Sequence, residues 1–198
     1  CVGTVGTTER SWNFTIASEA AEWTSSSGVP EWSPGGHNSN ASIKVRSGFI
    51  PGSGHIVNFA RITLSSLPGN GTYMLSAWVK ANDSSAVGRH ATLAVVPGIT
   101  GQPDPAYRSP EITLTDNWQE IVMTKTLDGT SAQPVTVGVF LPDFSSGPPG
   151  IPEYSVLIDD IRFRRIGIPT CSSSGCLTQC PTGMGGCENI VDAASLLH

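Results

Sequence analysis

The sequence predicts an all-β protein, an antiparallel β-sandwich, and three observations support this fold class. Only 14% of the 198 residues are charged, while the chain contains 22 glycines and 15 prolines. Apolar and polar residues alternate with a period of two through most of the chain, which is typical of strands with one face on a core. Loops rich in Pro and Gly separate about eight such segments at spacings of roughly 10–20 residues, a pattern that indicates a sandwich.

The strands can be followed in chain order. Residues 8–23 hold the only stretch with any helical tendency. The alternating segments that we expect to form strands are 41–47, 73–81, 91–96, two short strands within 111–127 around a turn at Asp116 and Asn117, 133–142 and 154–163. In segment 73–81, one face carries Tyr73, Leu75, Ala77 and Val79, and the more polar face carries Met74, Ser76, Trp78 and Lys80.

The alternation stops near residue 168. We therefore expect a β-sandwich domain over residues 1–168 and, over 169–198, a cysteine-rich tail or the start of a further module. Four cysteines in this tail are spaced C-x4-C-x3-C-x6-C without a histidine between them, which differs from common zinc sites and indicates disulfides in an oxidising compartment. The expected disulfide cysteines are Cys1, Cys171, Cys176, Cys180 and Cys187, an odd number that leaves one without a partner in this sequence.

Several features indicate a secreted or cell-surface protein. The net charge of −5 argues against a nucleic-acid partner, and no apolar run reaches the ~20 residues of a membrane span. Cys1 has two interpretations, a lipidated cysteine or a disulfide partner. Four N-x-S/T sequons predict N-glycosylation at Asn13, Asn40, Asn70 and Asn82.

Five motifs carry a family resemblance that spans roughly residues 10–166. The first, "NFTIASEAAEW" (13–23), ends at Trp23, "NSNASIKV" (38–45) is the second, and "PGNGTYMLSAWVK" begins at Pro68. Further along come Thr115, Trp118 and Ile121, then "LIDDIRF" from Leu157 to Phe163. In this order and spacing the motifs resemble the jelly-roll carbohydrate-binding modules often appended to xylanases and glucanases. The glycine usual before the "SIKV" strand is absent here, and the cysteine-rich tail lies outside the family pattern.

Binding of a polysaccharide or glycan is the function that these residues favour. Sugars offer C–H faces that stack on flat aromatic rings, and hydroxyl rims that bond to polar side chains. Trp78 lies between Ser76 and Lys80 on the polar face of its strand, although it could instead cover the second sheet or a loop. Trp32 and Tyr107 lie in loops, where an aromatic ring is either a ligand contact or a cover over one end of the sandwich. The candidate ligand-binding residues are Trp78, Lys80, Ser76, Arg46, Lys44, Asn58, Arg61, Trp32 and Tyr107.

The adjacent carboxylates of Asp159 and Asp160 need compensation, because apolar residues flank them on both sides. On a regular strand they point to opposite faces, so they cannot form an acid–base pair. Hydrogen bonds, an arginine or a calcium ion could stabilise them. The resemblance implies a structural calcium where the last strand meets the N-terminal segment, with Asp159, Asp160, Glu19 and Glu22 as candidate ligands.

The sequence therefore predicts a secreted, non-catalytic β-sandwich module that binds a polysaccharide or glycan and belongs to a larger extracellular protein. An extracellular structural or adhesion domain that binds protein partners is the alternative. A polysaccharide-degrading jelly-roll enzyme is less favoured, because His37, His55 and His90 are scattered and no catalytic motif is present.

Overall fold

A computed structural model of the chain describes residues 10–25, 29–46, 58–67, 71–98, 104–127, 133–142 and 154–166. Within these ranges the chain forms eleven strands, one short α-helix and one 3-10 turn, so the expected all-β fold is confirmed. The cysteine-rich tail and all five cysteines lie outside the described residues. No helix in the described ranges is long and apolar enough to cross a bilayer.

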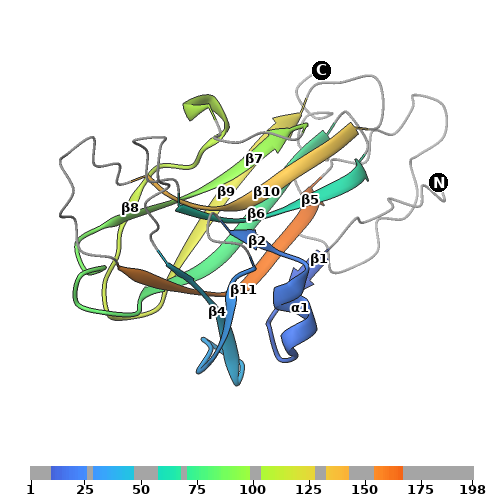
Figure 1. The fold of residues 1–198 in the computed structure, drawn as a ribbon. Coiled ribbons are helices and arrows are strands. Elements are labelled where there is room, and N and C mark those ends of the chain that lie inside the picture. Colours follow the sequence, from blue (N-terminus) through green and yellow to red (C-terminus); the bar gives the residue numbers. More distant parts are fainter. Residues whose placement is uncertain are drawn as a thin grey trace, which may run out of the picture. The chain divides into compact units, whose positions relative to one another are not determined.

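The strands form two antiparallel sheets (Figure 1). In the six-stranded sheet the order is β3 (Glu31–Pro34), β4 (Ala41–Arg46), β11 (Ser155–Ile166), β6 (Gly71–Ala81) and β9 (Gln119–Leu127), and β1 (Arg10–Trp12) pairs with β11. In the five-stranded sheet the order is β2 (Thr24–Ser25), β5 (Asn58–Leu67), β10 (Gln133–Leu141), β7 (His90–Pro97) and β8 (Ile112–Thr113). The 3-10 turn η1 (Pro105–Tyr107) lies beyond the five-stranded sheet, on the side away from the other sheet (Figure 1).

The main core lies between the two sheets and is built by the period-two alternation. The inward face of β6 consists of Tyr73, Leu75, Ala77 and Val79, all fully buried as the sequence predicts. The inward residues of β10 that meet them from the other sheet are Val135, Val137, Val139 and Leu141. Each buried Val or Leu side chain stabilises the fold by roughly 1.5–3 kcal/mol through the area it removes from water.

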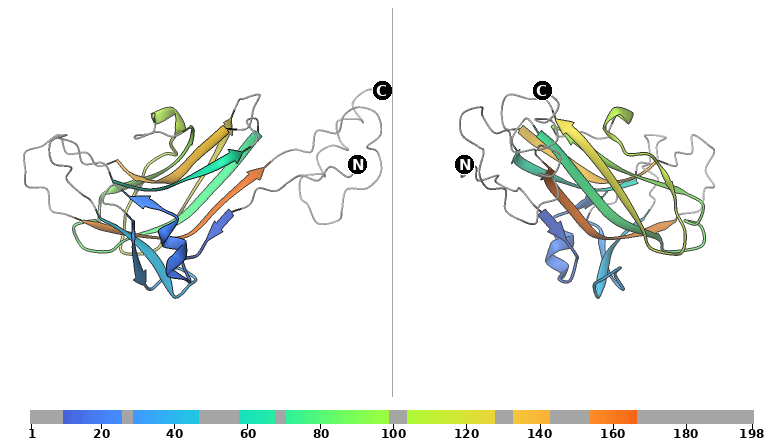
Figure 2. Two further views of the ribbon diagram at one scale, coloured as in Figure 1. Left: turned by 45° about the vertical axis from the view of Figure 1, so that its right-hand side comes forward. Right: turned by 180° about the vertical axis from the view of Figure 1, so that it is seen from behind.

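The N-terminal segment closes one side of this core. It includes the single-turn helix α1 (Ala17–Ala21), which lies beside the β3–β4 hairpin (Figure 2). Trp12 and Phe14 both pack edge-to-face on Trp23, and all three rings are buried. The helical tendency of residues 8–23 is thus confirmed only for five residues, because the aromatic side chains of this segment are drawn into the core.

Four strands within the described ranges escaped the sequence interpretation, namely β1, β2, β3 and β5. In β5 the inward residues Ala60 and Leu64 alternate with Phe59 and Arg61, so an aromatic ring points outward where a polar side chain is expected. The period of two is present in β5, but an apolar residue on each face hides it.

Candidate functional site

The outer face of the five-stranded sheet carries a second apolar cluster, separate from the main core. Its members, which we call the outer aromatic cluster, are Phe59, Ala94, Val96 and Phe140, with Tyr107 packed against them. They come from β5, β7, β10 and η1. The rings of Phe59 and Phe140 lie with their centroids 5.9 Å apart, and both side chains are buried. An outward sheet face made of aromatic and aliphatic side chains is unusual, because such a face is ordinarily polar.

Two cations lie over rings of this cluster. The Arg61 guanidinium is 4.5 Å from the centroid of the Phe59 ring, and the Lys125 ammonium is 4.7 Å from that of Tyr107. Lys125 Nζ also donates to the carbonyl of Ala106 at 2.9 Å, and Asp104 Oδ1 accepts from the Ala106 N–H at 2.8 Å. These contacts fix η1, and with it Tyr107, which remains partly exposed.

Hydroxyl groups accompany the aromatic cluster on the same face. Thr63 and Thr136 are cross-strand neighbours whose hydroxyls are 3.1 Å apart, and Thr136 donates to the carbonyl of Gly98 at 2.8 Å. Gly138 lies between Arg61 and Ala94 in the register, where a Cβ would meet the carbonyl oxygen of Ala60 at 2.4 Å. This face therefore combines rings, small residues and hydroxyls.

The outer face of the six-stranded sheet is organised differently, because the β3–β4 turn (residues 35–40) folds onto it. The His37 imidazole stacks on the Trp78 indole with centroids 3.5 Å apart and planes 11° apart. Trp118 meets the same imidazole edge-on at 6.0 Å. One face of the Trp78 ring is thus occupied by a side chain of the protein itself.

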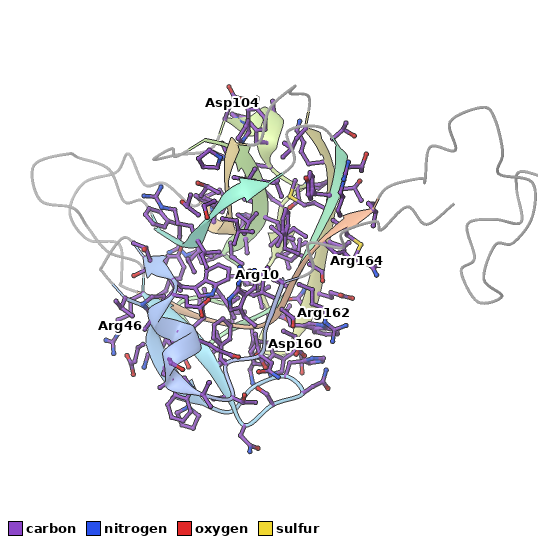
Figure 3. The ribbon with its side chains drawn as sticks, turned by 90° about the vertical axis from the view of Figure 1, so that its right-hand side faces the viewer. Arg10, Arg46, Asp104, Asp160, Arg162 and Arg164 are labelled. Atoms are coloured by element: carbon purple, nitrogen blue, oxygen red, sulfur yellow. The ribbon has the colours of Figure 1, made fainter. Side chains whose placement is uncertain are left out.

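A β-bulge brings Asp159 and Asp160 to the same turn. The register between β11 and β6 shifts between Asp159 and Arg162, and Asp160 has a φ of +46°. Asp160, Arg162 and Arg164 point to one side of β11 (Figure 3), and Asp159, paired with Trp78, faces that side too. The expectation that the two carboxylates point to opposite faces is therefore wrong, because it assumed a regular strand.

The turn supplies donors to both carboxylates. Asp159 Oδ2 accepts from the His37 N–H at 2.7 Å and from the Ser39 hydroxyl at 3.0 Å. Asp160 Oδ2 lies 3.0 Å from His37 Nδ1 and accepts from Asn38 Nδ2 at 3.0 Å. Burial raises the pKa of Asp159 despite these bonds, because desolvation disfavours its charged form. Both carboxylates are engaged in holding the turn, which argues against their use in acid–base catalysis.

The calcium ion that the resemblance implies can be tested against these atoms. Asp159 is fully buried, and its Oδ1 has no hydrogen-bond partner. A Cβ on Gly36 would lie 2.2 Å from Ser39 Oγ, 2.3 Å from the Ala41 carbonyl oxygen and 2.4 Å from Asp159 Oδ2. Oxygen atoms of these three kinds are ligands that calcium accepts. The donor set around Asp159 therefore fits a calcium ion.

The other expected calcium ligands do not join this set. Glu22 Oε2 instead accepts from the Trp12 indole N–H at 3.0 Å, and Glu19 Oε2 is buried without a hydrogen-bond partner. Among the described residues, no three His, Cys, Asp or Glu side chains are grouped as metal ligands. A calcium site here would thus depend on Asp159 together with carbonyl and hydroxyl oxygens.

The candidate ligand-binding residues are divided among three places. Those on the outer face of the six-stranded sheet are Lys44, Arg46, Ser76, Trp78 and Lys80, of which Ser76 is buried. Arg61 and Tyr107 belong to the outer face of the five-stranded sheet. Trp32 lies on the edge strand β3, and the side chain of Asn58 is outside the described atoms. These residues therefore cannot line one site.

Some site residues were not found from the sequence. Phe59, although it lies in the outer aromatic cluster, was not a candidate, because an aromatic residue in an alternating segment is ordinarily assigned to the core. His37 was noted only as one of several scattered histidines. The sequons at Asn13, Asn40 and Asn82 are exposed and Asn70 lies outside the described residues, so glycosylation stays a prediction.

Comparison with known proteins supports the fold. No protein-family model matches the sequence, and no curated protein is similar to it. The chain is similar to the CBM22-1 xylan-binding domain of Paenibacillus barcinonensis Xyn10C, with a TM-score of 0.55 and 15% identity over 80% of this chain and 94% of that one.

Two longer solved structures contain a similar domain. The tandem CBM22-1–CBM22-2 domain of the same enzyme has a TM-score of 0.57 and 16% identity over 84% of this chain and 51% of that one. The CBM22-1–GH10 modules of Clostridium thermocellum Xyn10B, complexed with xylohexaose, have a TM-score of 0.51 and 17% identity over 80% of this chain and 28% of that one. The chain thus has the jelly-roll fold of carbohydrate-binding modules.

Proposed function

We propose that this chain is a non-catalytic glycan-binding domain whose ligand lies along the outer face of the five-stranded sheet. The observation that carries the proposal is the outer aromatic cluster. Rings and aliphatic side chains occupy positions where an outward sheet face is ordinarily polar, and the partly exposed Tyr107 and Arg61 border them. The likeness to the fold of xylan-binding domains agrees with this proposal.

The chemistry of the face suits a sugar chain. Phe59 and Phe140 are buried and form an apolar floor, while Arg61 and Tyr107 are partly exposed at its border. The C–H face of a pyranose would stack on the Tyr107 ring, and its hydroxyls would bond to the Arg61 guanidinium and the exposed Thr63 hydroxyl.

Affinity electrophoresis in gels that contain xylan, mixed-linkage β-glucan or soluble chitin derivatives tests the proposal. We expect retardation of the wild type in at least one gel, and at least a tenfold weaker affinity for Tyr107→Ala, which corresponds to about 1.4 kcal/mol. Tyr107→Phe keeps the ring and serves as the matched control. A wild type that no polysaccharide retards, or a Tyr107→Ala variant with unchanged affinity, contradicts the proposal.

A structural calcium ion at Asp159 belongs to the same proposal. The ligands would be Asp159, the Ser39 hydroxyl and the Ala41 carbonyl oxygen, and the ion would neutralise the buried carboxylate. It would stabilise the fold beneath the β3–β4 turn, on the sheet opposite the outer aromatic cluster. Secretion, disulfides in the cysteine-rich tail and attachment to neighbouring modules complete the proposal and rest on the sequence.

A further inference from the structure

Two arginines lie in one row of paired residues across the outer face of the five-stranded sheet. In the strand register Arg61 pairs with Gly138, and Gly138 pairs with Ala94. Ala94 in turn forms an isolated antiparallel bridge with Arg108. Residues paired across antiparallel strands share one face of the sheet, and Ala60 faces the core, so its neighbour Arg61 and the residues paired with it face outward. We call Arg61, Gly138, Ala94 and Arg108 the arginine row.

Only small residues separate the two arginines. Gly138 has no side chain and Ala94 has a single methyl group, and both residues are buried. Neighbouring strands lie about 4.8 Å apart, so the Cα atoms of Arg61 and Arg108 are about 14 Å apart along the row. Both arginine side chains are partly exposed. The two arginines therefore flank a strip of the face where no other long side chain of the row stands between them.

The arginine row adjoins the rings of the outer aromatic cluster. The Arg61 guanidinium lies over the Phe59 ring, 4.5 Å from its centroid, and Arg108 directly follows Tyr107 in the chain. Lys125 adds a third cation, because its ammonium is 4.7 Å from the centroid of the Tyr107 ring. A guanidinium holds its N–H donors in a planar fork that matches two oxygens of an anionic group. Rings and cations thus border the same part of the face.

Acidic side chains are missing from the described pairs on this part of the face. The outward pairs on either side of the arginine row are Phe59 with Phe140, Phe140 with Thr92, Thr63 with Thr136, and Thr136 with Val96. Asp104 and Glu111, the acidic residues nearest to Arg108 in the sequence, both lie outside these pairs. Cations are therefore gathered on one face of a protein whose net charge of −5 would otherwise repel an anionic ligand.

We infer that the glycan bound at the outer aromatic cluster is an acidic one, whose sugars carry carboxylate or sulfate groups. The anionic group binds to the guanidinium groups of Arg61 and Arg108, while a neighbouring sugar ring stacks on Tyr107. This inference rests on the proposed function and adds the charge class of the ligand. A hydrogen bond to a charged partner is roughly twice as strong as one between neutral groups, so the arginine row favours an acidic polymer over a neutral one with the same backbone.

Biolayer interferometry on immobilised polysaccharides tests this inference with two matched pairs of polymers. One pair is glucuronoxylan and the same polymer with its carboxylates reduced to alcohols, and the other is a sulfated galactan and its desulfated form. We expect the wild type to bind the acidic member of at least one pair roughly tenfold more tightly than the neutral member at about 0.15 M salt. The preference should shrink at about 1 M salt, because salt screens the charges. This comparison uses the wild type alone and does not depend on how any variant folds.

Arg108→Gln tests the arginine that completes the row. Glutamine keeps N–H donors but removes the charge, so we expect the ratio of the acidic to the neutral affinity to fall roughly three- to tenfold. Arg162→Gln is the matched control, because it removes the same charge from β11 in the six-stranded sheet and should keep the wild-type ratio. An Arg108→Gln variant with the wild-type ratio overturns the role of the arginine row.

The outcomes separate this inference from the proposed function. Equal affinity of the wild type for the acidic and neutral members of both pairs overturns the inference while glycan binding stands. Binding to a neutral polysaccharide without binding to either acidic polymer has the same meaning. A wild type that binds no polysaccharide, acidic or neutral, overturns both.

Discussion

Replacement of His37 by alanine tests whether the β3–β4 turn is held onto the six-stranded sheet by the contacts described above. His37→Ala removes two interactions that the structure shows. One is the stack of the imidazole on the Trp78 indole, with ring centroids 3.5 Å apart. The other is the contact between Nδ1 and Asp160 Oδ2 at 3.0 Å. The backbone N–H of residue 37 still reaches Asp159 in the variant, so the buried carboxylate keeps that donor.

The expected loss follows from these two contacts. A stacked aromatic pair contributes about 0.5–1.5 kcal/mol, and a partly buried hydrogen bond to a charged group about 1.5 kcal/mol. Asp160 retains the Asn38 amide donor, so no orphaned charge adds to the loss. We therefore expect His37→Ala to lower the free energy of unfolding by about 2–3 kcal/mol, or the melting temperature by about 4–12 °C for a chain of this size.

Urea denaturation followed by tryptophan fluorescence measures this loss, and His37→Phe separates its parts. The phenylalanine ring can still stack on Trp78 but cannot bond to Asp160, so we expect it to recover about 0.5–1.5 kcal/mol relative to alanine. Asn38→Ala is the control for a general effect of changing the turn, and should cost less than His37→Ala. The reasoning is refuted if His37→Ala stays within about 0.5 kcal/mol of the wild type, a difference usual for surface substitutions.

Three further changes probe other contacts of the fold. Asp83→Ala removes a carboxylate that accepts from the N–H and hydroxyl of Ser155 at 2.8 and 2.7 Å, and we expect a loss of about 2–3 kcal/mol in urea denaturation, with Asp104→Ala as the milder control. Burial tends to raise the pKa of Asp83, but hydrogen bonds from Ser155, Ser85 and Ala86 together lower it, so its stabilising effect is present at neutral pH and is lost as pH falls through the folded-state value. Asp159→Asn keeps an acceptor for His37 and Ser39 while removing a buried charge, so in EDTA at pH 7 we expect a melting temperature equal to or above that of the wild type. Because burial raises the folded-state pKa of Asp159, wild-type stability from this group increases as pH falls, and the advantage of Asn shrinks toward pH 4. Added calcium should raise the melting temperature of the wild type above that of Asp159→Asn. If calcium shifts neither melting curve, the result argues against the ion. Gly36→Ala places a methyl within 2.4 Å of three oxygen atoms, so it should lower the melting temperature by destabilising the turn. Gly35→Ala is the control, because its methyl meets no neighbouring atom and only backbone strain at the positive φ should lower its melting temperature.

The layout of the core could be predicted because burial follows strand periodicity. Alternation in 73–81 and 133–142 separated inward from outward residues, and the structure gives both strands a neighbouring strand on each side. The short strands β1 and β3 could not be found in this way, since three or four residues contain too few periods. Within the described ranges β3 pairs with β4 alone, and its formation depends on a partner that lies some ten residues away along the chain.

The candidate site could be predicted only in part, because a site depends on which faces come together. The ligand-binding candidates were chosen as polar or aromatic residues on outward positions, and Arg61 and Tyr107 do border the outer aromatic cluster. Sequence periodicity does not say which sheet a strand joins, so Trp78 and Arg61 were assigned to one surface although they lie on different sheets. Phe59 was missed because an aromatic residue in a strand is ordinarily assigned to the core. Only the structure shows that the neighbouring Ala60 faces the core, so that Phe59 must point outward.

The bulge at Asp160 explains how the β3–β4 turn comes to lie on the outer face of the six-stranded sheet. A regular strand would turn one of the two carboxylates into the core, where it would lack partners. The extra residue in β11 turns both toward residues 35–40, and this turn then covers Trp78, the ring that sequence alone favours as a sugar platform. The outer face of the six-stranded sheet is thereby occupied by the protein's own hairpin. The outer aromatic cluster lies on the other sheet, and for this reason variants at Tyr107, rather than at Trp78, test the proposed glycan site.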